Sequence, residues 1–168
     1  IFGMKNQEKT SFDIVVVGAG PAGLAFAKAL SGHGLRIAVI DPANLDALEN
    51  PAYDGREIAL THFSYRVMGE LGFLDHIKDD QVSLIKNAHV MNGDSPYALR
   101  FDHRESGQET LGYMLSNQNI RRASYAAVRG ADGITLLDQC RVRAVCTGAD
   151  EASVTLDDGR VLTARLIV

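Results

Sequence analysis

The residues best suited to chemistry lie near the start of the chain, in the run Gly18-Ala19-Gly20-Pro21-Ala22-Gly23. This G-x-G-x-x-G pattern follows an apolar run, and an acid, Asp41, ends the next apolar run 23 residues after Gly18. Gly18 permits a tight turn, Gly20 lets a pyrophosphate approach the backbone, and Gly23 lets a helix pack closely on a strand. Asp41 can accept hydrogen bonds from ribose hydroxyls. The pattern therefore predicts a dinucleotide site in which a helix amino terminus offers unpaired N–H groups to the pyrophosphate.

The sequence on either side of the glycine loop predicts the strands and the helix that must position it. Residues 13–18 are β-branched and apolar on both faces, which is typical of a central parallel strand. A helix is predicted over 21–31, with Pro21 in its first turn, and a second strand over 36–40. Strand, glycine turn, helix and strand make a βαβ unit. The alternative is a glycine-rich turn in an α/β domain that binds no nucleotide, with Asp41 as a helix cap or loop acid.

The rest of the sequence predicts an α/β fold with an antiparallel β insertion after the first βαβ unit. Residues 42–53 are expected to form a surface loop, because Asp, Asn and Pro dominate there. Two further helices are predicted, one capped by Thr61 and one capped by Asn117 and running to about residue 129. The remaining strands are expected within residues 56–60, 82–102 with a turn at 92–96, 111–115, 134–137, 141–146, 153–156 and 161–168.

Composition excludes several classes of partner. With 17 basic and 21 acidic residues the net charge is −4, so no basic field attracts nucleic acid. The apolar stretch over 14–30 is interrupted by glycines and a proline, so neither a transmembrane helix nor an export signal fits it. We therefore expect a cytoplasmic protein, either free or peripheral to the inner membrane.

Other reactive residue types lack a catalytic arrangement. The five histidines and two cysteines show no metal-ligand spacing, and neither a G-x-S-x-G nor a P-loop sequence occurs. The run Asp102-His103-Arg104-Glu105 contains groups for acid–base work, but consecutive polar residues in a loop usually form a solvated face. No catalytic side chain and no metal site is therefore predicted.

Three further segments carry a family resemblance: residues 54–61 (DGREIALT), residues 111–122 (LGYMLSNQNIRR) and residues 156–168 (LDDGRVLTARLIV). In this order and spacing the chain resembles the FAD-dependent aromatic hydroxylases similar to para-hydroxybenzoate hydroxylase, and most of all their ubiquinone-biosynthesis branch. NAD and FAD share the glycine fingerprint, so the resemblance is what selects FAD. It implies a Rossmann-like FAD-binding domain, FAD as cofactor, NAD(P)H and O2 as co-substrates, and a polyprenylated phenol as the ring to be hydroxylated.

The resemblance also implies roles for individual residues. The implied cofactor-binding set is Gly18, Gly20, Pro21, Ala22, Gly23, Asp41, Arg56 and Asn117. In it, the glycines hold the pyrophosphate, Asp41 the ribose, Arg56 the pyrophosphate and ribityl chain, and Asn117 lies near the flavin. The alternative for Arg56 is a surface salt bridge with Asp54 or Glu57, and the alternative for Asn117 is a helix N-cap.

By the same resemblance, residues 13–168 are the N-terminal part of an FAD/NAD(P)-binding domain whose substrate domain is largely absent. Residues 1–12 are expected to be disordered or left over from expression. The relatives' next cofactor motif would begin just after Val168, so we expect this length of chain alone to be inactive and to hold FAD weakly. The expected substrate is a hydrophobic aromatic compound. The protein is also expected to associate with a membrane surface or with other enzymes, and with a second copy of itself through its open apolar strand edge.

Two other functions remain open at this point. One is a related flavin-dependent halogenase or prenyl reductase acting on another hydrophobic substrate. The other is a dinucleotide-binding module without turnover.

Overall fold

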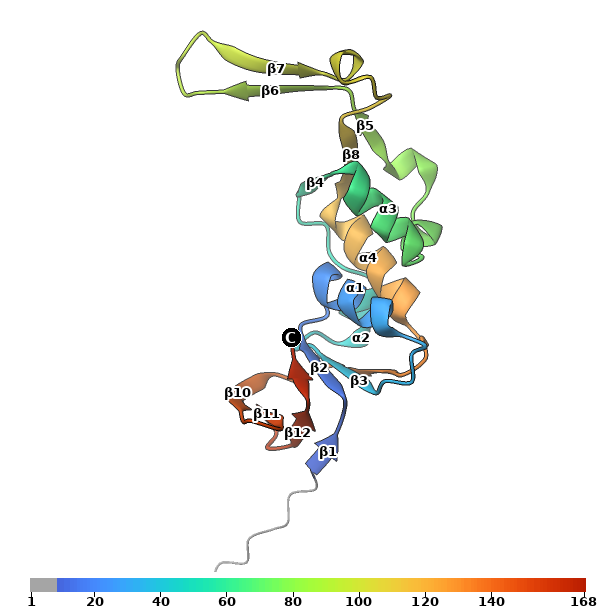
Figure 1. Ribbon diagram of the computed structural model, residues 1–168, viewed down its shortest axis with the longest axis vertical. Helices are drawn as coiled ribbons and strands as arrows, with labels where there is room; N and C mark the ends of the chain where they lie inside the picture. Colours follow the sequence, from blue (N-terminus) through green and yellow to red (C-terminus); the bar gives the residue numbers. More distant parts are fainter. Residues whose placement is uncertain (1–8) are drawn as a thin grey trace, which may run out of the picture. The chain divides into compact units, whose positions relative to one another are not determined.

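The computed structural model describes residues 9–168, which divide into two compact units (Figure 1). The first unit comprises the described residues up to Pro51 together with 124–168, and the second comprises 52–123. The division falls within helix α4 (Asn117–Val128). Within residues 1–12, which were expected to be disordered or left over from expression, β1 (Lys9–Ser11) is ordered and pairs in parallel with β12 (Val161–Ala164). Residues 1–8, to which the same expectation applied, lie outside the described residues.

A four-stranded parallel sheet forms the centre of the first unit. Its order is β13-β2-β3-β9, with β13 (Leu166–Ile167), β2 (Ile14–Val17), β3 (Ile37–Ile40) and β9 (Ile134–Leu137). Helix α1 (Pro21–Leu30) connects β2 to β3, which pair in parallel from Ile14 opposite Ile37 to Val17 opposite Ile40. The predicted βαβ unit is therefore confirmed.

Both faces of this parallel sheet are buried. Ile14 and Val16 lie on the face that packs against α1, where Leu24 belongs to the same cluster. Val15 lies on the opposite face and packs in a second cluster with Val154 of the neighbouring sheet. Because side chains alternate along a strand, a strand covered on both sides must be apolar at every position. This explains the uninterrupted β-branched run that precedes the glycine loop.

The second sheet of this unit is mostly antiparallel and runs in the order β1-β12-β11-β10, with β10 (Val142–Thr147) and β11 (Ala152–Leu156). The sequence predicted one strand over 161–168, and this is wrong because the run is shared between two sheets. β12 pairs with β11, whereas β13 pairs with β2. The change occurs at Arg165, where the N–H groups of Arg165 and Leu166 both donate to the carbonyl of Asp13, at 3.1 and 3.3 Å.

The second unit contains the expected antiparallel insertion. A three-stranded antiparallel sheet has the order β4-β8-β5, and strands β6 and β7 form a separate hairpin. Short 3-10 helices lie at Leu74–His76, Asp79–Gln81 and His103–Ser106. The other elements are β4 (Glu57–Leu60), α3 (His62–Glu70), β5 (Ser83–Ile85), β6 (Asn87–Met91), β7 (Ala98–Asp102) and β8 (Gly112–Ser116).

Two predictions about helix starts need correction. The expected loop over 42–53 contains α2 (Leu45–Glu49), because the Asn44 side chain accepts the N–H of Ala47 and caps a short helix. Helix α4 is capped not by Asn117 but by the preceding Ser116, whose hydroxyl accepts the N–H of Asn119 at 3.2 Å. The Asn117 side chain is thereby free for another contact. The predicted cap of α3 is confirmed, since Thr61 accepts the N–H of Ser64.

Candidate functional site

The glycine loop lies at the carboxyl edge of the parallel sheet, between β2 and α1, where the N–H of Gly18 donates to the Ile40 carbonyl at 2.8 Å. Gly18 has φ +113°, a conformation that residues with a side chain rarely adopt. A Cβ at Gly23 would lie 2.2 Å from the Gly18 carbonyl oxygen, so only glycine allows α1 to pack on the loop. The fold itself therefore requires these two glycines.

Gly20 is different, because nothing among residues 9–168 requires a glycine there. Its φ is −75°, which any residue adopts, and a Cβ would have no atom within 4 Å. The space beside Gly20 is open. This is the position at which the sequence pattern expects a pyrophosphate to approach the backbone.

The amino terminus of α1 lacks the side-chain cap that the other described α-helices have. Within the described part of the chain, no side-chain cap hydrogen bond is present at its N-cap, Gly20, and its first turn contains no acidic residue. By contrast, α2, α3 and α4 begin at side chains that accept an N–H, those of Asn44, Thr61 and Ser116. Uncapped N–H groups and the positive end of the helix dipole favour an anion. The loop and helix therefore fit the diphosphate of a dinucleotide.

Asp41 directly follows β3 and contacts the glycine loop. Its Oδ2 accepts the backbone N–H of Ala19 at 2.7 Å, and its Oδ1 accepts the N–H of Ala43 at 2.8 Å. The sequence did not predict the bond to Ala19, which links the middle of the glycine loop to the end of β3. Each carboxylate oxygen has a second lone pair, so the arrangement also permits ribose hydroxyls as donors. The ribose contact itself stays a prediction.

Arg56 and Asn117 meet in the second unit at one carboxylate oxygen. Nε and Nη2 of Arg56 donate to Oδ2 of Asp54 at 2.8 and 2.5 Å, and Nδ2 of Asn117 donates to the same oxygen at 2.7 Å. The backbone adds a link, because the N–H of Asn117 donates to the Arg56 carbonyl. The salt bridge considered for Arg56 is thus present, whereas the N-cap considered for Asn117 is not. The structure thus brings together Arg56 and Asn117, two of the residues that the resemblance assigns to the cofactor.

Asp54 is the residue that sequence reasoning treated only as a salt-bridge partner. The pKa of Asp54 is lowered from 3.8 to about 2. The largest cause is the hydrogen bond from the Arg56 side chain, and the next largest is the hydrogen bond from the Asn117 side chain. Its carboxylate is therefore charged at neutral pH. The Asp54 side chain is 26% exposed and that of Arg56 is 66% exposed, so the guanidinium remains open to a ligand. The Asp-x-Arg spacing could have indicated the contact between Asp54 and Arg56, but it gave no indication of the contact with Asn117.

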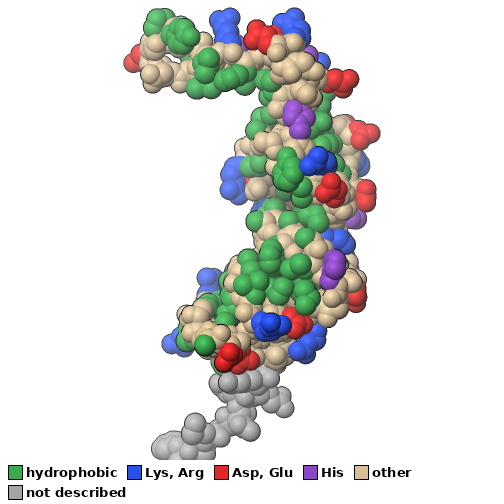
Figure 2. Space-filling view, viewed as in Figure 1, with side chains coloured by type: hydrophobic (Ala, Val, Ile, Leu, Met, Phe, Trp, Pro, Cys, Tyr) green, Lys and Arg blue, Asp and Glu red, His purple; other side chains and the backbone are tan. Residues whose placement is uncertain are grey.

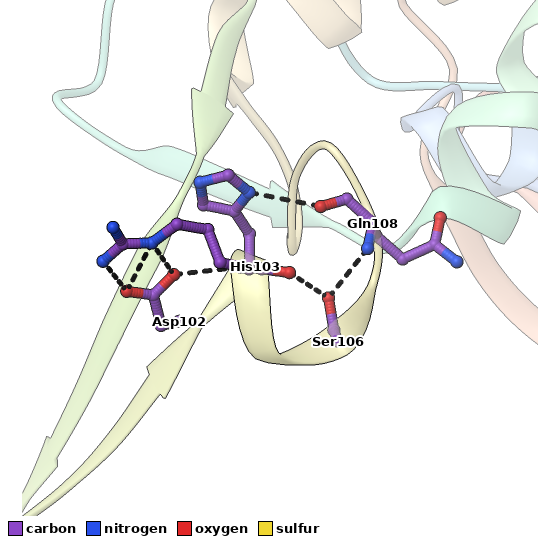
Figure 3. A network of polar contacts seen from close by, with 5 residues as sticks. Asp102, His103, Ser106 and Gln108 are labelled. Atoms are coloured by element: carbon purple, nitrogen blue, oxygen red, sulfur yellow. Dashed lines mark hydrogen bonds and ion pairs between the residues drawn. The ribbon is translucent and has the colours of Figure 1, made fainter.

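The polar run after β7 closes a turn rather than forming a catalytic group (Figure 3). Asp102 accepts the backbone N–H and the guanidinium of Arg104, and the Ser106 hydroxyl donates to the His103 carbonyl. The N–H of Gln108 donates to Ser106, and its carbonyl contacts His103 Nδ1 at 3.2 Å. All five residues lie in one short segment. Their contacts hold the 3-10 helix His103–Ser106 in place.

Other candidate features lie away from the glycine loop or are not found. A cavity of about 310 Å³ lies beside Ile14, at the opposite end of β2, and is lined also by Asp13, Leu35, Arg165 and Leu166. In the part of the chain that the structure describes, no three His, Cys, Asp or Glu side chains gather as metal ligands. No helix within residues 9–168 combines the length and the apolar character that crossing a membrane requires.

Comparison with known proteins identifies the family. A family model described as pyridine nucleotide-disulphide oxidoreductase matches residues 12–107, more than half of the chain. The ubiquinone hydroxylase UbiM of Neisseria meningitidis is 47% identical over 160 residues, covering 93% of this chain and 35% of the relative. The ubiquinone hydroxylase UbiL of Rhodospirillum rubrum is 32% identical over 156 residues, covering 93% of this chain and 36% of the relative. The chain thus spans about a third of the length of these relatives.

Solved structures share the fold. PqsL from Pseudomonas aeruginosa, described as a probable FAD-dependent monooxygenase, has a TM-score of 0.69 and 23% identity, covering 94% of this chain and 42% of its own. The p-nitrophenol 4-monooxygenase PnpA from Pseudomonas putida has a TM-score of 0.69 and 18% identity, covering 94% and 40%. These likenesses confirm the Rossmann-like α/β fold with its antiparallel β insertion. The two ubiquinone hydroxylases confirm the expected resemblance to that group. Because the family model matches residues 12–107, this chain belongs to the pyridine nucleotide-disulphide oxidoreductase family.

Proposed function

We propose that the protein carrying this chain is an FAD-dependent monooxygenase that hydroxylates an aromatic ring in ubiquinone biosynthesis. The ring is a polyprenylated phenol, and NAD(P)H and O2 are the co-substrates. The observation that carries the proposal is the open space at Gly20 beside the uncapped amino terminus of α1. The 47% identity to a protein named ubiquinone hydroxylase, over 93% of this chain, supports the choice of reaction.

In this proposal the first unit holds the adenosine diphosphate part of FAD. The backbone of Gly18, Gly20 and Gly23 approaches the pyrophosphate, and the N–H groups of the first turn of α1 donate to it. Pro21 suits the first helical position because it has no N–H to leave unpaired, and Ala22 adds no bulk beside the phosphates. Asp41 accepts the ribose hydroxyls.

Arg56 and Asn117 are further polar donors to FAD in this proposal, a role that the resemblance to the FAD-dependent hydroxylases implies. Arg56 suits the pyrophosphate and ribityl chain because a guanidinium offers several donors in a rigid fork. Bound FAD would supply the redox chemistry of the hydroxylation. The residues of this chain bind and orient the cofactor. The proposal therefore needs no nucleophile among them.

The proposed substrate also suggests a location. A polyprenylated phenol is hydrophobic and resides in a membrane, so we propose that the protein works at the periphery of the inner membrane, alone or with other enzymes of the pathway. The test of this part is whether the purified protein sediments with vesicles that contain the substrate.

The experiment that tests the activity uses the full-length protein. We expect a yellow protein whose visible flavin spectrum is bleached by NAD(P)H without oxygen, and which forms a product heavier than the prenylated phenol by one oxygen atom when air is admitted. Binding of NAD without FAD would instead support a nucleotide-binding module. Bound FAD with no oxygen in the product would support a related reductase or halogenase.

A further inference from the structure

Three Asp-x-Arg pairs occur in the chain and share one local geometry. Asp54 pairs with Arg56 at 2.5 Å, Asp102 with Arg104 at 2.5 Å, and Asp158 with Arg160 at 2.6 Å. In each pair the carboxylate also accepts the backbone N–H of the arginine, at 3.1, 2.9 and 2.9 Å. The pairing is therefore a property of the two-residue spacing and does not by itself mark a functional site.

The Asp54 pair differs because its carboxylate also binds a third residue from a distant part of the sequence, whereas in the Asp158 pair the distant contact, from Arg160 to Cys140 Sγ, is made by the arginine. Asn117, 63 residues further along, donates its side-chain amide to the oxygen that binds Arg56. The backbone places Asn117 there, because β4 and β8 pair with Glu57 opposite Ser116. The N–H of Asn117 also donates to the Arg56 carbonyl at 2.9 Å. Asp54 thus lies between the two residues proposed to contact the cofactor.

This arrangement limits the freedom of an otherwise exposed arginine. An arginine side chain loses rotamer entropy when it is fixed, so a partner that fixes it in advance reduces that loss on binding. Arg56 uses two of its five N–H donors on Asp54 among the described contacts, which leaves three for a ligand. Asn117 likewise retains one amide N–H in these contacts.

We propose that Asp54 is the positioning residue of the FAD site: its carboxylate holds the Arg56 guanidinium and the Asn117 amide together so that both present their remaining donors to the cofactor. The inference rests on the proposed function. Asp54 itself does not bind FAD, because a charged carboxylate repels a pyrophosphate. It acts only through Arg56 and Asn117.

An alternative role for Asp54, competition with FAD for Arg56, predicts the opposite change in FAD affinity. If Asp54 merely competes with the pyrophosphate for Arg56, its removal frees the guanidinium and tightens FAD binding. If Asp54 positions Arg56, its removal weakens FAD binding. The sign of the change in Kd therefore decides between the two.

The experiment compares Asp54→Ala, Asp54→Asn and Asp102→Ala in the full-length protein, by titrating each with FAD and following the quenching of flavin fluorescence. Asp102→Ala is the matched control, since it breaks the same type of pair at a turn outside the proposed site. We expect Asp54→Ala to raise the Kd for FAD about tenfold and Asp102→Ala to leave it unchanged. Asp54→Asn keeps one acceptor oxygen and should recover part of the loss.

Two further measurements separate positioning from a general loss of structure. Asp54→Ala and Asp102→Ala should unfold without FAD at similar temperatures, both a little below the unsubstituted protein at neutral pH. The double variant Asp54→Ala/Arg56→Ala should lose less FAD affinity than the product of the two single losses, because part of the effect of Asp54 passes through Arg56. Unchanged or tighter FAD binding by Asp54→Ala overturns the inference, and so does a double variant whose losses multiply. If the unsubstituted protein binds no FAD, the proposed function fails as well; normal binding that is indifferent to Asp54 overturns the inference alone. Should Asp54→Ala not fold, Asp54→Asn decides by the same comparison.

Discussion

The Asp41 carboxylate accepts the backbone N–H of Ala19 at 2.7 Å. Ala19 lies between Gly18 and Gly20, so this bond fixes the glycine loop against the end of the neighbouring parallel strand. The second carboxylate oxygen accepts the N–H of Ala43 at 2.8 Å, which shapes the chain beyond β3. A residue predicted from sequence to contact a ribose thus also organises the loop that is proposed to hold the pyrophosphate.

We therefore expect Asp41→Ala to destabilise the protein even without a nucleotide. The N–H groups of Ala19 and Ala43 lose their acceptor, and losing hydrogen bonds to a charged group costs about 1.5–3 kcal/mol of unfolding free energy. Urea unfolding measures the change. Asp46→Ala is the control, because the Asp46 carboxylate accepts only from the exposed side chain of Asn50 among the side-chain contacts seen here. Equal stability of the two variants would contradict the structural role of Asp41.

The glycines of the loop should separate into two classes on substitution by alanine. Gly23→Ala places a Cβ 2.2 Å from the Gly18 carbonyl oxygen, so we expect loss of the folded state. Gly20→Ala meets no atom within 4 Å and should leave the unfolding temperature nearly unchanged while abolishing FAD binding. Circular dichroism and FAD titration check both variants. A stable Gly23→Ala protein, or a Gly20→Ala protein that binds FAD normally, would be incompatible with this division.

The parts of the fold that could be predicted from sequence are those set by local pattern. The run over 13–18 indicated a buried parallel strand because it is apolar at every position, and Pro21 marked the start of α1. The pattern did not show that residues 161–168 change sheets at Arg165, because that depends on which strands lie alongside. Helix α2 was missed because its five residues resemble a polar loop, and its cap is a single contact between Asn44 and Ala47.

In the candidate site, too, only the features set by local sequence could be predicted. The glycine motif carries its own geometry, so its position at the carboxyl edge of the sheet could be predicted. The contact of Asp54 with Asn117 could not, because it joins residues 63 positions apart through the pairing of β4 with β8. Sequence suggested an N-cap role for Asn117, and Ser116, one residue earlier, performs it.

The pH dependence of stability should reveal the Asp54 contacts. Arg56 and Asn117 lower the pKa of Asp54 from 3.8 to about 2, so the charged form is favoured in the folded chain. This contribution is complete above the unfolded pKa, from about pH 5 upwards, and is lost as the pH falls through the folded value. We expect Asp54→Asn to lower the unfolding temperature at neutral pH and to match the unsubstituted protein near pH 2. Thermal unfolding across this range measures the difference.

The control for this pH series is Asp102→Asn. Hydrogen bonds from Arg104 also lower the pKa of Asp102, so its stabilising contribution should likewise fade in acid. A difference between the unsubstituted protein and Asp54→Asn that grows as the pH falls would have the wrong sign for this account.

The β6–β7 hairpin should promote self-association. Val90 pairs with Leu99 across the two strands, both side chains are about half exposed, and hydrophobic side chains gather over the hairpin (Figure 2). Exposed apolar patches of this kind favour association. We expect Val90→Thr/Leu99→Thr to reduce the apparent mass in light scattering without changing the unfolding temperature. Val145→Thr, at an exposed position on β10, serves as control. Unchanged association of Val90→Thr/Leu99→Thr would contradict this role of the hairpin.

The central claim is that the glycine loop holds the pyrophosphate of FAD, and a paired titration tests it most directly. The full-length protein and its Gly20→Ala variant are titrated separately with FAD and with NAD(P)H, following the flavin spectrum and the heat of binding. The account predicts that the unsubstituted protein binds FAD, that NAD(P)H then reduces the flavin, and that a folded Gly20→Ala variant binds no FAD. Binding of NAD(P)H without FAD, or equal FAD affinity in the two proteins, would contradict it.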